Sequence, residues 1–211
     1  MVDLDSAVRG LLRDVGAVLR PLGFRGSAGL WRLVTPDGVA VVQKQGYRGS
    51  PPDAKLFFLD TGVAPIAWWE WTKGFDSPMD RAQEHHGLRL VEGRVAWTDP
   101  ASGHRGYADV WRVAADTDLA RLRADLVAEA ARAARLLVEL LEPDGYLDRL
   151  RAVRDKQLGH WPPFVVLLAA HGPSAELDAA CAGLRDAFAA RPGTTGYVER
   201  LVGWARDRAS R

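Results

Sequence analysis

Residues 30–47, LWRLVTPDGVAVVQKQGY, carry the clearest structural signal in the chain. Two strand-like runs, Leu30–Thr35 and Val39–Tyr47, flank the sequence Thr35-Pro36-Asp37-Gly38. Proline presets φ for a turn and glycine accepts a positive φ, so this tetrapeptide has the residues that a tight reversal needs. The segment therefore predicts a β-hairpin.

The residues before the hairpin predict a helix, and those after it predict more strands. Apolar side chains recur at helical spacing over Leu4–Leu19, and Asp3 or Asp5 is placed to cap that helix. The polar residues 76–83, which include Pro78, predict a connecting loop. Further strands are expected at Lys55–Val63, Leu88–Val91, Arg94–Thr98 and Tyr107–Val113.

From Thr117 onward the apolar period becomes helical. A stripe from Leu119 to Leu141 predicts one long helix, with Asp116 or Thr117 as its cap. Further helices are expected at Tyr146–Gln157, Pro162–Ala170, Ala175–Ala190 and Thr195–Arg208, although periodicity alone leaves the apolar run 162–170 open between helix and strand.

This order of elements predicts an α+β protein. We expect an N-terminal helix, a curved antiparallel sheet of five or six strands, a long helix packed on that sheet and a helical C-terminal third. Residues 1–155 are expected to form the core domain, with residues 156–211 as a helical extension packed on the same domain.

The charge composition argues against a polyanionic partner. The 28 Lys and Arg residues balance 27 Asp and Glu residues, which leaves a net charge of +1. We therefore expect no nucleic-acid partner. No apolar run approaches the roughly 18 residues of a spanning helix, and the acidic first residues do not resemble a signal peptide, so we expect a soluble cytoplasmic protein without a membrane partner.

The eight tryptophans are many for a chain of 211 residues. Three of them, Trp68, Trp69 and Trp71, are almost adjacent, and neighbouring residues cannot all face one core. We expect at least one of these three to be partly exposed or to line a groove. The other five are expected to fill the core: Trp31, Trp97, Trp111, Trp161 and Trp204.

Several short motifs follow one another as in a known family. They are Val18-Leu19-Arg20-Pro21-Leu22-Gly23-Phe24, Leu30-Trp31-Arg32, Val41-Val42-Gln43-Lys44-Gln45 and Phe57-Phe58-Leu59-Asp60-Thr61-Gly62-Val63. Later come His85-His86-Gly87-Leu88-Arg89-Leu90 and the tryptophan-bearing segment Tyr107–Trp111. In this order, over roughly residues 5–155, the chain resembles the bacterial domain of unknown function 4304 family.

The resemblance implies a curved antiparallel sheet with flanking helices and no established activity. The family segment carries an Arg shortly after its His. This chain departs from that pattern with Gly87, and Arg89 is the candidate replacement.

No recognised catalytic or metal-binding motif is present. His85 and His86 are adjacent, so in a strand they would point to opposite sides, and neither a second His at metal-ligand spacing nor a cysteine pair accompanies them. The single cysteine, Cys181, lies among alanines on a helical stripe, as a small buried apolar residue would. We expect no bound metal and no cofactor.

The predicted strand Val39–Gln45 changes character along one face. Gln43 and Gln45 share the face of Val39 and Val41, whereas Lys44 shares that of Val42. A face that turns from apolar to polar suggests the mouth of a groove, where the amides either bond internally or bind a ligand. The candidate residues for such a polar, aromatic cleft are Gln43, Gln45, Trp68, Trp69, Trp71, His86 and Arg89.

Two functions stay open at this point. The first is a non-enzymatic protein that binds a protein partner, with an immunity or modulator role as one form of it. The second is an enzyme or small-ligand binder of bacterial specialised metabolism, with His86 as acid or base, Arg89 as an anion clamp, and Gln43 and Gln45 as orienting groups.

Overall fold

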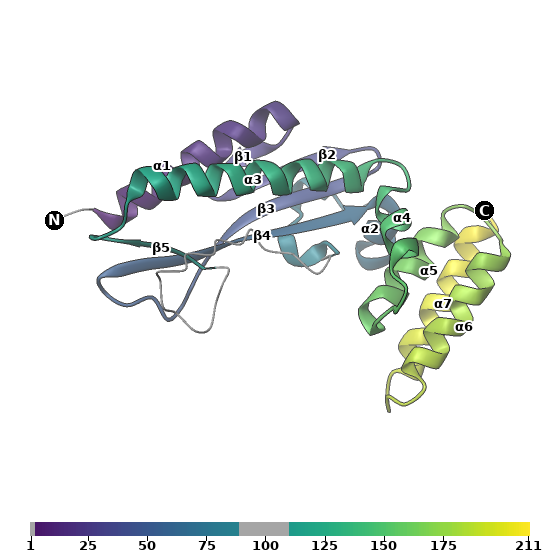
Figure 1. Ribbon diagram of the computed structural model, residues 1–211. Coiled ribbons are helices and arrows are strands. Elements are labelled where there is room, and N and C mark those ends of the chain that lie inside the picture. Colours follow the sequence, from purple (N-terminus) through teal and green to yellow (C-terminus); the bar gives the residue numbers. More distant parts are fainter. Residues whose placement is uncertain (1–2, 89–109) are drawn as a thin grey trace. The chain divides into compact units, whose positions relative to one another are not determined.

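The centre of the fold is a five-stranded antiparallel sheet with the strand order β1-β2-β3-β4-β5 (Figure 1). The computed structural model describes residues 3–88 and 110–211. Within them, the α+β class and the antiparallel sheet predicted from the sequence are confirmed. The strands are β1 (Arg25–Ser27), β2 (Leu30–Thr35), β3 (Gly38–Gly46), β4 (Ala54–Pro65) and β5 (Trp111–Ala114).

Strands β2 and β3 form the predicted hairpin. Thr35 pairs with Gly38, so Pro36 and Asp37 make a two-residue loop. The Thr35 hydroxyl oxygen accepts a hydrogen bond from the backbone N–H of Asp37 at 3.2 Å. This register sets which side chains share a face along the whole hairpin.

Helix α1 (Leu4–Leu19) begins and ends where its sequence predicts. Of its two candidate caps, Asp3 is the one used, because its carboxylate accepts a hydrogen bond from the Ser6 N–H at 3.1 Å. The apolar stripe of the helix is buried, and its members are Val8, Leu11, Leu12, Val15 and Leu19.

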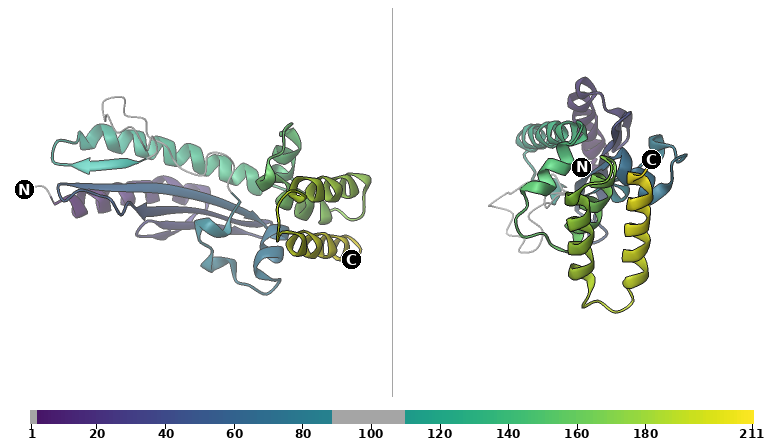
Figure 2. Two further views of the ribbon diagram at one scale, coloured as in Figure 1. Left: turned by 90° about the horizontal axis from the view of Figure 1, so that it is seen from below. Right: turned by 90° about the vertical axis from the view of Figure 1, so that its right-hand side faces the viewer.

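Helix α3 (Leu119–Leu141) lies beside α1 along the sheet (Figures 1 and 2). An ion pair of 2.8 Å between Arg123 Nε and Asp14 Oδ2 joins the two helices. Trp31 on β2 and Trp111 on β5 are fully buried, as predicted. Trp97 lies outside the described residues, and Trp161 and Trp204 are half-buried.

The predicted cap of α3 is wrong by one or two residues. The Asp118 carboxylate accepts hydrogen bonds from the N–H groups of Ala120 and Arg121, both at 3.1 Å. Asp118 is the residue directly before the first helical one, which is where a side chain can reach the first free N–H groups. Thr117 instead accepts a hydrogen bond from Ala114 N at the end of β5.

The chain divides into two compact units. Unit 1 comprises residues 1–63 and 78–139, and unit 2 comprises residues 64–77 and 140–211. The sequence-based division into residues 1–155 and 156–211 stays a prediction. The expected strands Leu88–Val91 and Arg94–Thr98, and the first part of Tyr107–Val113, fall on residues 89–109, outside the described residues, except that Leu88 forms an isolated bridge with Val63.

Unit 2 is helical and is built around α5 (Trp161–Ala169). All residues from Pro162 to Ala169 are buried, and α5 contacts each of the other helices of the unit. A helix that is apolar all round needs such surroundings, which settles residues 162–169 as a helix. The others are α2 (Ile66–Lys73), α4 (Gly145–Ala152, shorter than predicted), α6 (Ala175–Phe188) and α7 (Thr195–Ala209).

Among the described residues, no helix combines the length and the apolar character that crossing a membrane would require.

A glycine in α1 allows the helix to approach Trp31, which yields a first prediction. A Cβ atom at Gly16 would lie 2.9 Å from Trp31 Nε1, whereas one at Gly10 would meet no atom within 4 Å. Alanine normally stabilises a helix by about 1 kcal/mol relative to glycine. We expect Gly10→Ala to raise the free energy of unfolding by about that amount, and Gly16→Ala to lower it by about 1–2 kcal/mol through overpacking.

Urea unfolding of the two variants and the parent measures this difference. Equal stabilisation by both substitutions would show that Trp31 does not restrict position 16.

Candidate functional site

Gln43 and Gln45 on β3 both bond to Glu84, the first residue of a short 3₁₀ turn, η3 (Glu84–His86). Gln45 Nε2 donates a hydrogen bond to Glu84 Oε1 at 2.6 Å, and the Glu84 N–H donates one to Gln43 Oε1 at 3.5 Å. Glu84 is only 2% exposed, so its carboxylate depends on such donors. We call Gln43, Gln45 and Glu84 the Gln–Glu cluster.

The turn η3 lies directly on the sheet because two glycines leave it room. A Cβ at Gly62 on β4 would lie 2.4 Å from the Glu84 carbonyl oxygen, and one at Gly87 would lie 2.6 Å from Val63 N. The amides of Gln43 and Gln45 therefore meet a segment of the same chain. This contact gives them the internal hydrogen bonding that their position on a sheet face requires.

The two histidines of η3 have local partners. His86 Nδ1 accepts a hydrogen bond from Gln83 N at 3.1 Å, which closes the turn, and the rings of His85 and His86 lie 4.2 Å apart. His85 Nδ1 lies 3.6 Å from Glu84 Oε1. Within residues 3–88 and 110–211, no group of three or more His, Cys, Asp or Glu side chains is placed to hold a metal ion.

The candidate tryptophans belong to unit 2, on α2. Trp69 is buried, and its Nε1 donates a hydrogen bond to the Ser77 carbonyl at 2.8 Å. Trp71 is half-buried against Trp204, with ring centroids 5.4 Å apart. Trp68 is also half-buried, so at least one of the three side chains is partly exposed, as expected from their adjacency.

The structure thus brings Gln43, Gln45 and His86 to one short turn in unit 1. The proposed cleft that would combine them with Trp68, Trp69 and Trp71 stays a prediction. Arg89, its expected anion clamp, lies outside the described residues.

A groove runs along α1 on the other face of β3. It has a volume of about 580 Å³. One wall is a stripe of α1 continued by Arg20 in the following 3₁₀ turn, and the other comes from β1, β2, β3 and the turn between β1 and β2. We call this the α1 groove, and its residues are Asp5, Ser6, Val8, Arg9, Leu12, Arg13, Gly16, Arg20, Ser27, Ala28, Trp31 and Lys44.

The α1 groove has more cationic side chains than acidic partners for them. Arg9 pairs with Asp3 at 3.6 Å, and Asp5 pairs with Lys55 at 3.0 Å. The remaining cations, Arg13, Arg20 and Lys44, form no ion pair within the part of the chain that the structure describes.

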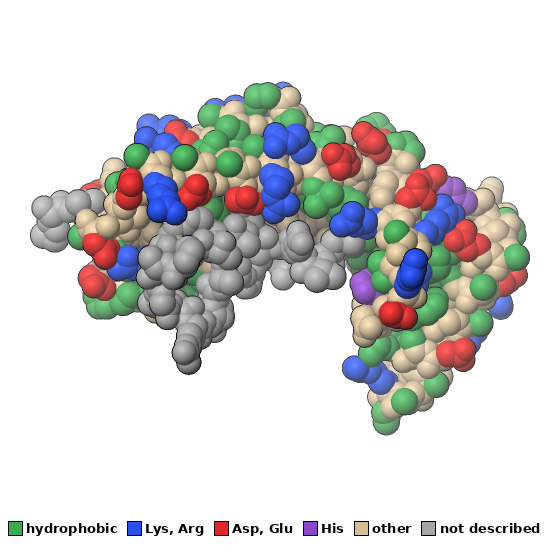
Figure 3. Space-filling model, in the orientation of Figure 1, with side chains coloured by type: hydrophobic (Ala, Val, Ile, Leu, Met, Phe, Trp, Pro, Cys, Tyr) green, Lys and Arg blue, Asp and Glu red, His purple; other side chains and the backbone are tan. Residues whose placement is uncertain are grey.

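Helix α3 has a different distribution of charge. Acidic and basic side chains lie interspersed along it on the face that Figure 3 shows. Of its four arginines, Arg121 and Arg132 pair with Asp125 and Glu129 of the same helix, and Arg123 pairs with Asp14 of α1. The α1 groove is therefore a local excess of positive charge in a protein whose net charge is +1.

Comparison with known proteins supplies the family. The model of the domain of unknown function DUF4304 matches residues 15–137, more than half of the chain. The chain belongs to this family. No curated protein and no solved structure matches it.

The DUF4304 segment contains the Gln–Glu cluster and the C-terminal half of the α1 groove, including Gly16, Arg20, Trp31 and Lys44. Sequence reasoning missed this groove. It assigned Lys44 correctly to the face of Val42, but it placed the candidate site on the opposite face, with Gln43 and Gln45. The available signal was the row of cations at helical spacing, Arg9, Arg13 and Arg20.

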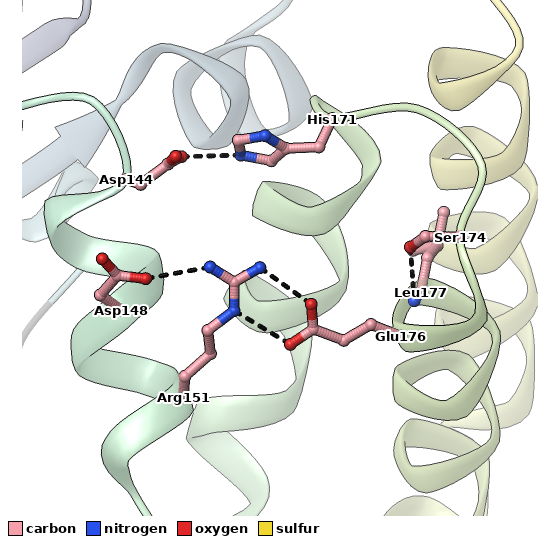
Figure 4. A network of polar contacts seen from close by, with 7 residues as sticks. All are labelled: Asp144, Asp148, Arg151, His171, Ser174, Glu176 and Leu177. Carbon is pink, nitrogen blue, oxygen red and sulfur yellow. Dashed lines mark hydrogen bonds and ion pairs between the residues drawn. The ribbon is translucent and has the colours of Figure 1, made fainter.

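Outside the DUF4304 segment, an ionic network joins α4 to α6 (Figure 4). Arg151 binds Glu176 through two hydrogen bonds, of 3.0 Å from Nε and 2.8 Å from Nη2, and contacts Asp148 through Nη1 at 2.9 Å. His171 Nε2 lies 2.7 Å from Asp144 Oδ1 nearby. These side chains are exposed, and they form hydrogen bonds and ion pairs with one another. We therefore interpret the network as a contact between helices and not as a binding site.

The Gln–Glu cluster gives a second prediction. Gln45→Met keeps the side-chain volume but removes a donor to a buried carboxylate, so we expect the free energy of unfolding to fall by about 1–3 kcal/mol. Adding Glu84→Met removes the acceptor of the same hydrogen bond. The double variant should therefore lose less than the two single losses combined, in a double-mutant cycle measured by urea unfolding. Strict additivity would contradict the coupling.

The ionic network gives a third prediction. The hydrogen bonds from Arg151 lower the pKa of Glu176, and those from Arg185 likewise lower the pKa of Glu199. Arg151→Gln should return the pKa of Glu176 toward its ordinary value and leave that of Glu199 unchanged, as followed by carbon-detected NMR titration.

The sign for stability follows from the same shift. A lowered carboxylate pKa stabilises the fold above the unfolded-state pKa, and this contribution is lost as the pH falls through the folded-state pKa. The parent should therefore lose more stability than Arg151→Gln does on acidification through that range. An unchanged Glu176 titration would contradict the contact.

Proposed function

We propose that this protein binds a protein partner without chemical conversion, and that the α1 groove in unit 1 is the binding surface. The observation that carries the proposal is the excess of cations along an open groove. Arg13, Arg20 and Lys44 line one cavity, and no acidic side chain of the described chain pairs with them.

The floor of the α1 groove supports the same function. It includes the apolar side chains of Val8, Leu12 and Trp31, which are all less than a tenth exposed. Side chains this well covered in the free protein offer a partner a small apolar contact area, so the charged rim forms most of the contact surface of the groove. A role in neutralising or modulating another protein is the form of this function that we favour.

The alternative is an enzyme or small-ligand binder that uses Gln43, Gln45 and His86. The geometry supports it less, because the amide of Gln45 and the backbone of η3 already bond within the Gln–Glu cluster. It predicts that His86→Ala abolishes ligand binding or turnover while the fold survives.

Native mass spectrometry of the tagged protein, captured gently from its own host, tests the proposal and gives a fourth prediction. The parent should carry an added protein mass. The charge-reversed variant Arg13→Glu/Arg20→Glu/Lys44→Glu should lose that mass, because like charges then face the partner.

A matched control makes the same change of charge on exposed arginines of unit 2, Arg154→Glu/Arg191→Glu/Arg200→Glu. This control should retain the partner. Only free protein of 23.1 kDa, an added mass of small-molecule size, or a partner retained by the charge-reversed variant would contradict the proposal.

A further inference from the structure

The α1 groove has the length of a short extended peptide. Its helical wall runs from Asp5 to Arg20, which at about 1.5 Å per residue is roughly 22 Å. An extended chain covers that length with about seven residues, at about 3.3 Å each.

The charges along the groove are arranged in order. At the end where α1 begins, Asp5 is engaged with Lys55, and Arg9 with Asp3. Arg13 and Arg20 follow toward the other end, and Lys44 lines the groove from β3 beside Leu12. Arg13 and Arg20 therefore lie toward the C-terminal end of the groove and Lys44 nearer its middle, where together they can bind two or three carboxylates of a ligand.

The floor between these cations is apolar and closely packed. Leu12 and Lys44 both lie near Gly29, where a Cβ atom would be 3.6 Å from Leu12 Cδ1 and 2.9 Å from Lys44 Cβ. Trp31 packs against Gly16 in the same region. An apolar side chain of the ligand can lie over this floor while its neighbours reach the cations, because alternate residues of an extended chain point to opposite sides.

A nucleic-acid strand fits these observations less well. An acidic side chain, Asp5, stands at one end of the groove, and three of the lining cations form no ion pair with the described residues. The strong affinity of proteins for nucleic acid usually depends on more phosphate contacts than three cations provide.

From these observations, and resting on the proposed function, we infer that the α1 groove binds an extended linear segment of the partner protein, about seven residues long, with two or more Asp or Glu side chains next to an apolar one. The acidic residues lie along the Arg13–Arg20 half of the groove. The contact is a peptide-recognition site in which charge gives register and the apolar residue gives affinity.

Selection from a phage-displayed library of random heptapeptides on the full-length protein tests this inference. We expect the enriched peptides to carry at least two acidic residues and one large apolar residue. Synthetic peptides with these sequences should bind the protein in fluorescence anisotropy measurements. Their affinity should fall as the NaCl concentration rises.

The variants locate the binding. An exposed ion pair is worth about 2- to 5-fold in affinity, so Arg13→Glu/Arg20→Glu/Lys44→Glu should lose at least 10-fold, and the unit 2 control Arg154→Glu/Arg191→Glu/Arg200→Glu should lose nothing. Peptides with Lys in place of Asp or Glu should recover binding to the charge-reversed variant. If that variant does not fold, the single substitutions Arg13→Gln and Lys44→Gln take its place, each with a 2- to 5-fold loss.

Three outcomes would overturn the inference: enriched peptides without acidic residues, acidic peptides that bind the charge-reversed variant equally well, or displacement of the peptides by an equal concentration of a twelve-residue oligothymidylate. Neutral peptides that still need the groove would leave the proposed partner binding intact and remove only the acidic segment. A host partner that binds elsewhere would remove the proposed function.

Discussion

The alternation of side chains along β3 determines what packs on each side of the sheet in unit 1, because one face of the strand contacts η3 and the other lines the α1 groove. The side chains of β3 alternate strictly, so Lys44 faces the α1 groove while Gln43 and Gln45 face the turn η3. A shift of register by one residue would exchange these sets, which would bury a lysine under η3 and send the amides toward α1. The two-residue loop at Pro36 and Asp37 fixes that register.

The local part of the structure could be predicted because its causes are local. The hairpin, the start of α1 and the alternation along β3 each depend on residues within a few positions of one another. The cap of α3 shows the limit of this reasoning, since Asp116, Thr117 and Asp118 are all good capping residues and only the backbone path selects one.

The candidate site was harder to predict because its partners are far apart in the chain. Gln45 bonds to Glu84 across 39 positions, and no periodicity links the two residues. The expected cleft treated the glutamines as open to a ligand, whereas a segment from much later in the chain bonds to them. The α1 groove needs α1, the β1–β2 turn and β3 together, so neither its volume nor its unpaired cations follow from any one segment.

The segment matched by the family model and the two compact units have different boundaries. The DUF4304 segment, residues 15–137, includes α2, yet Trp71 of that helix packs against Trp204 and Tyr197 of α7, beyond the segment.

The close fit of Gly16 against Trp31 has an evolutionary consequence for this family. A member that keeps tryptophan on β2 must keep glycine on the facing helix, whereas a member with a smaller side chain there can accept alanine. The two positions should therefore vary together across the family, as a linked pair of substitutions rather than as two independent sites.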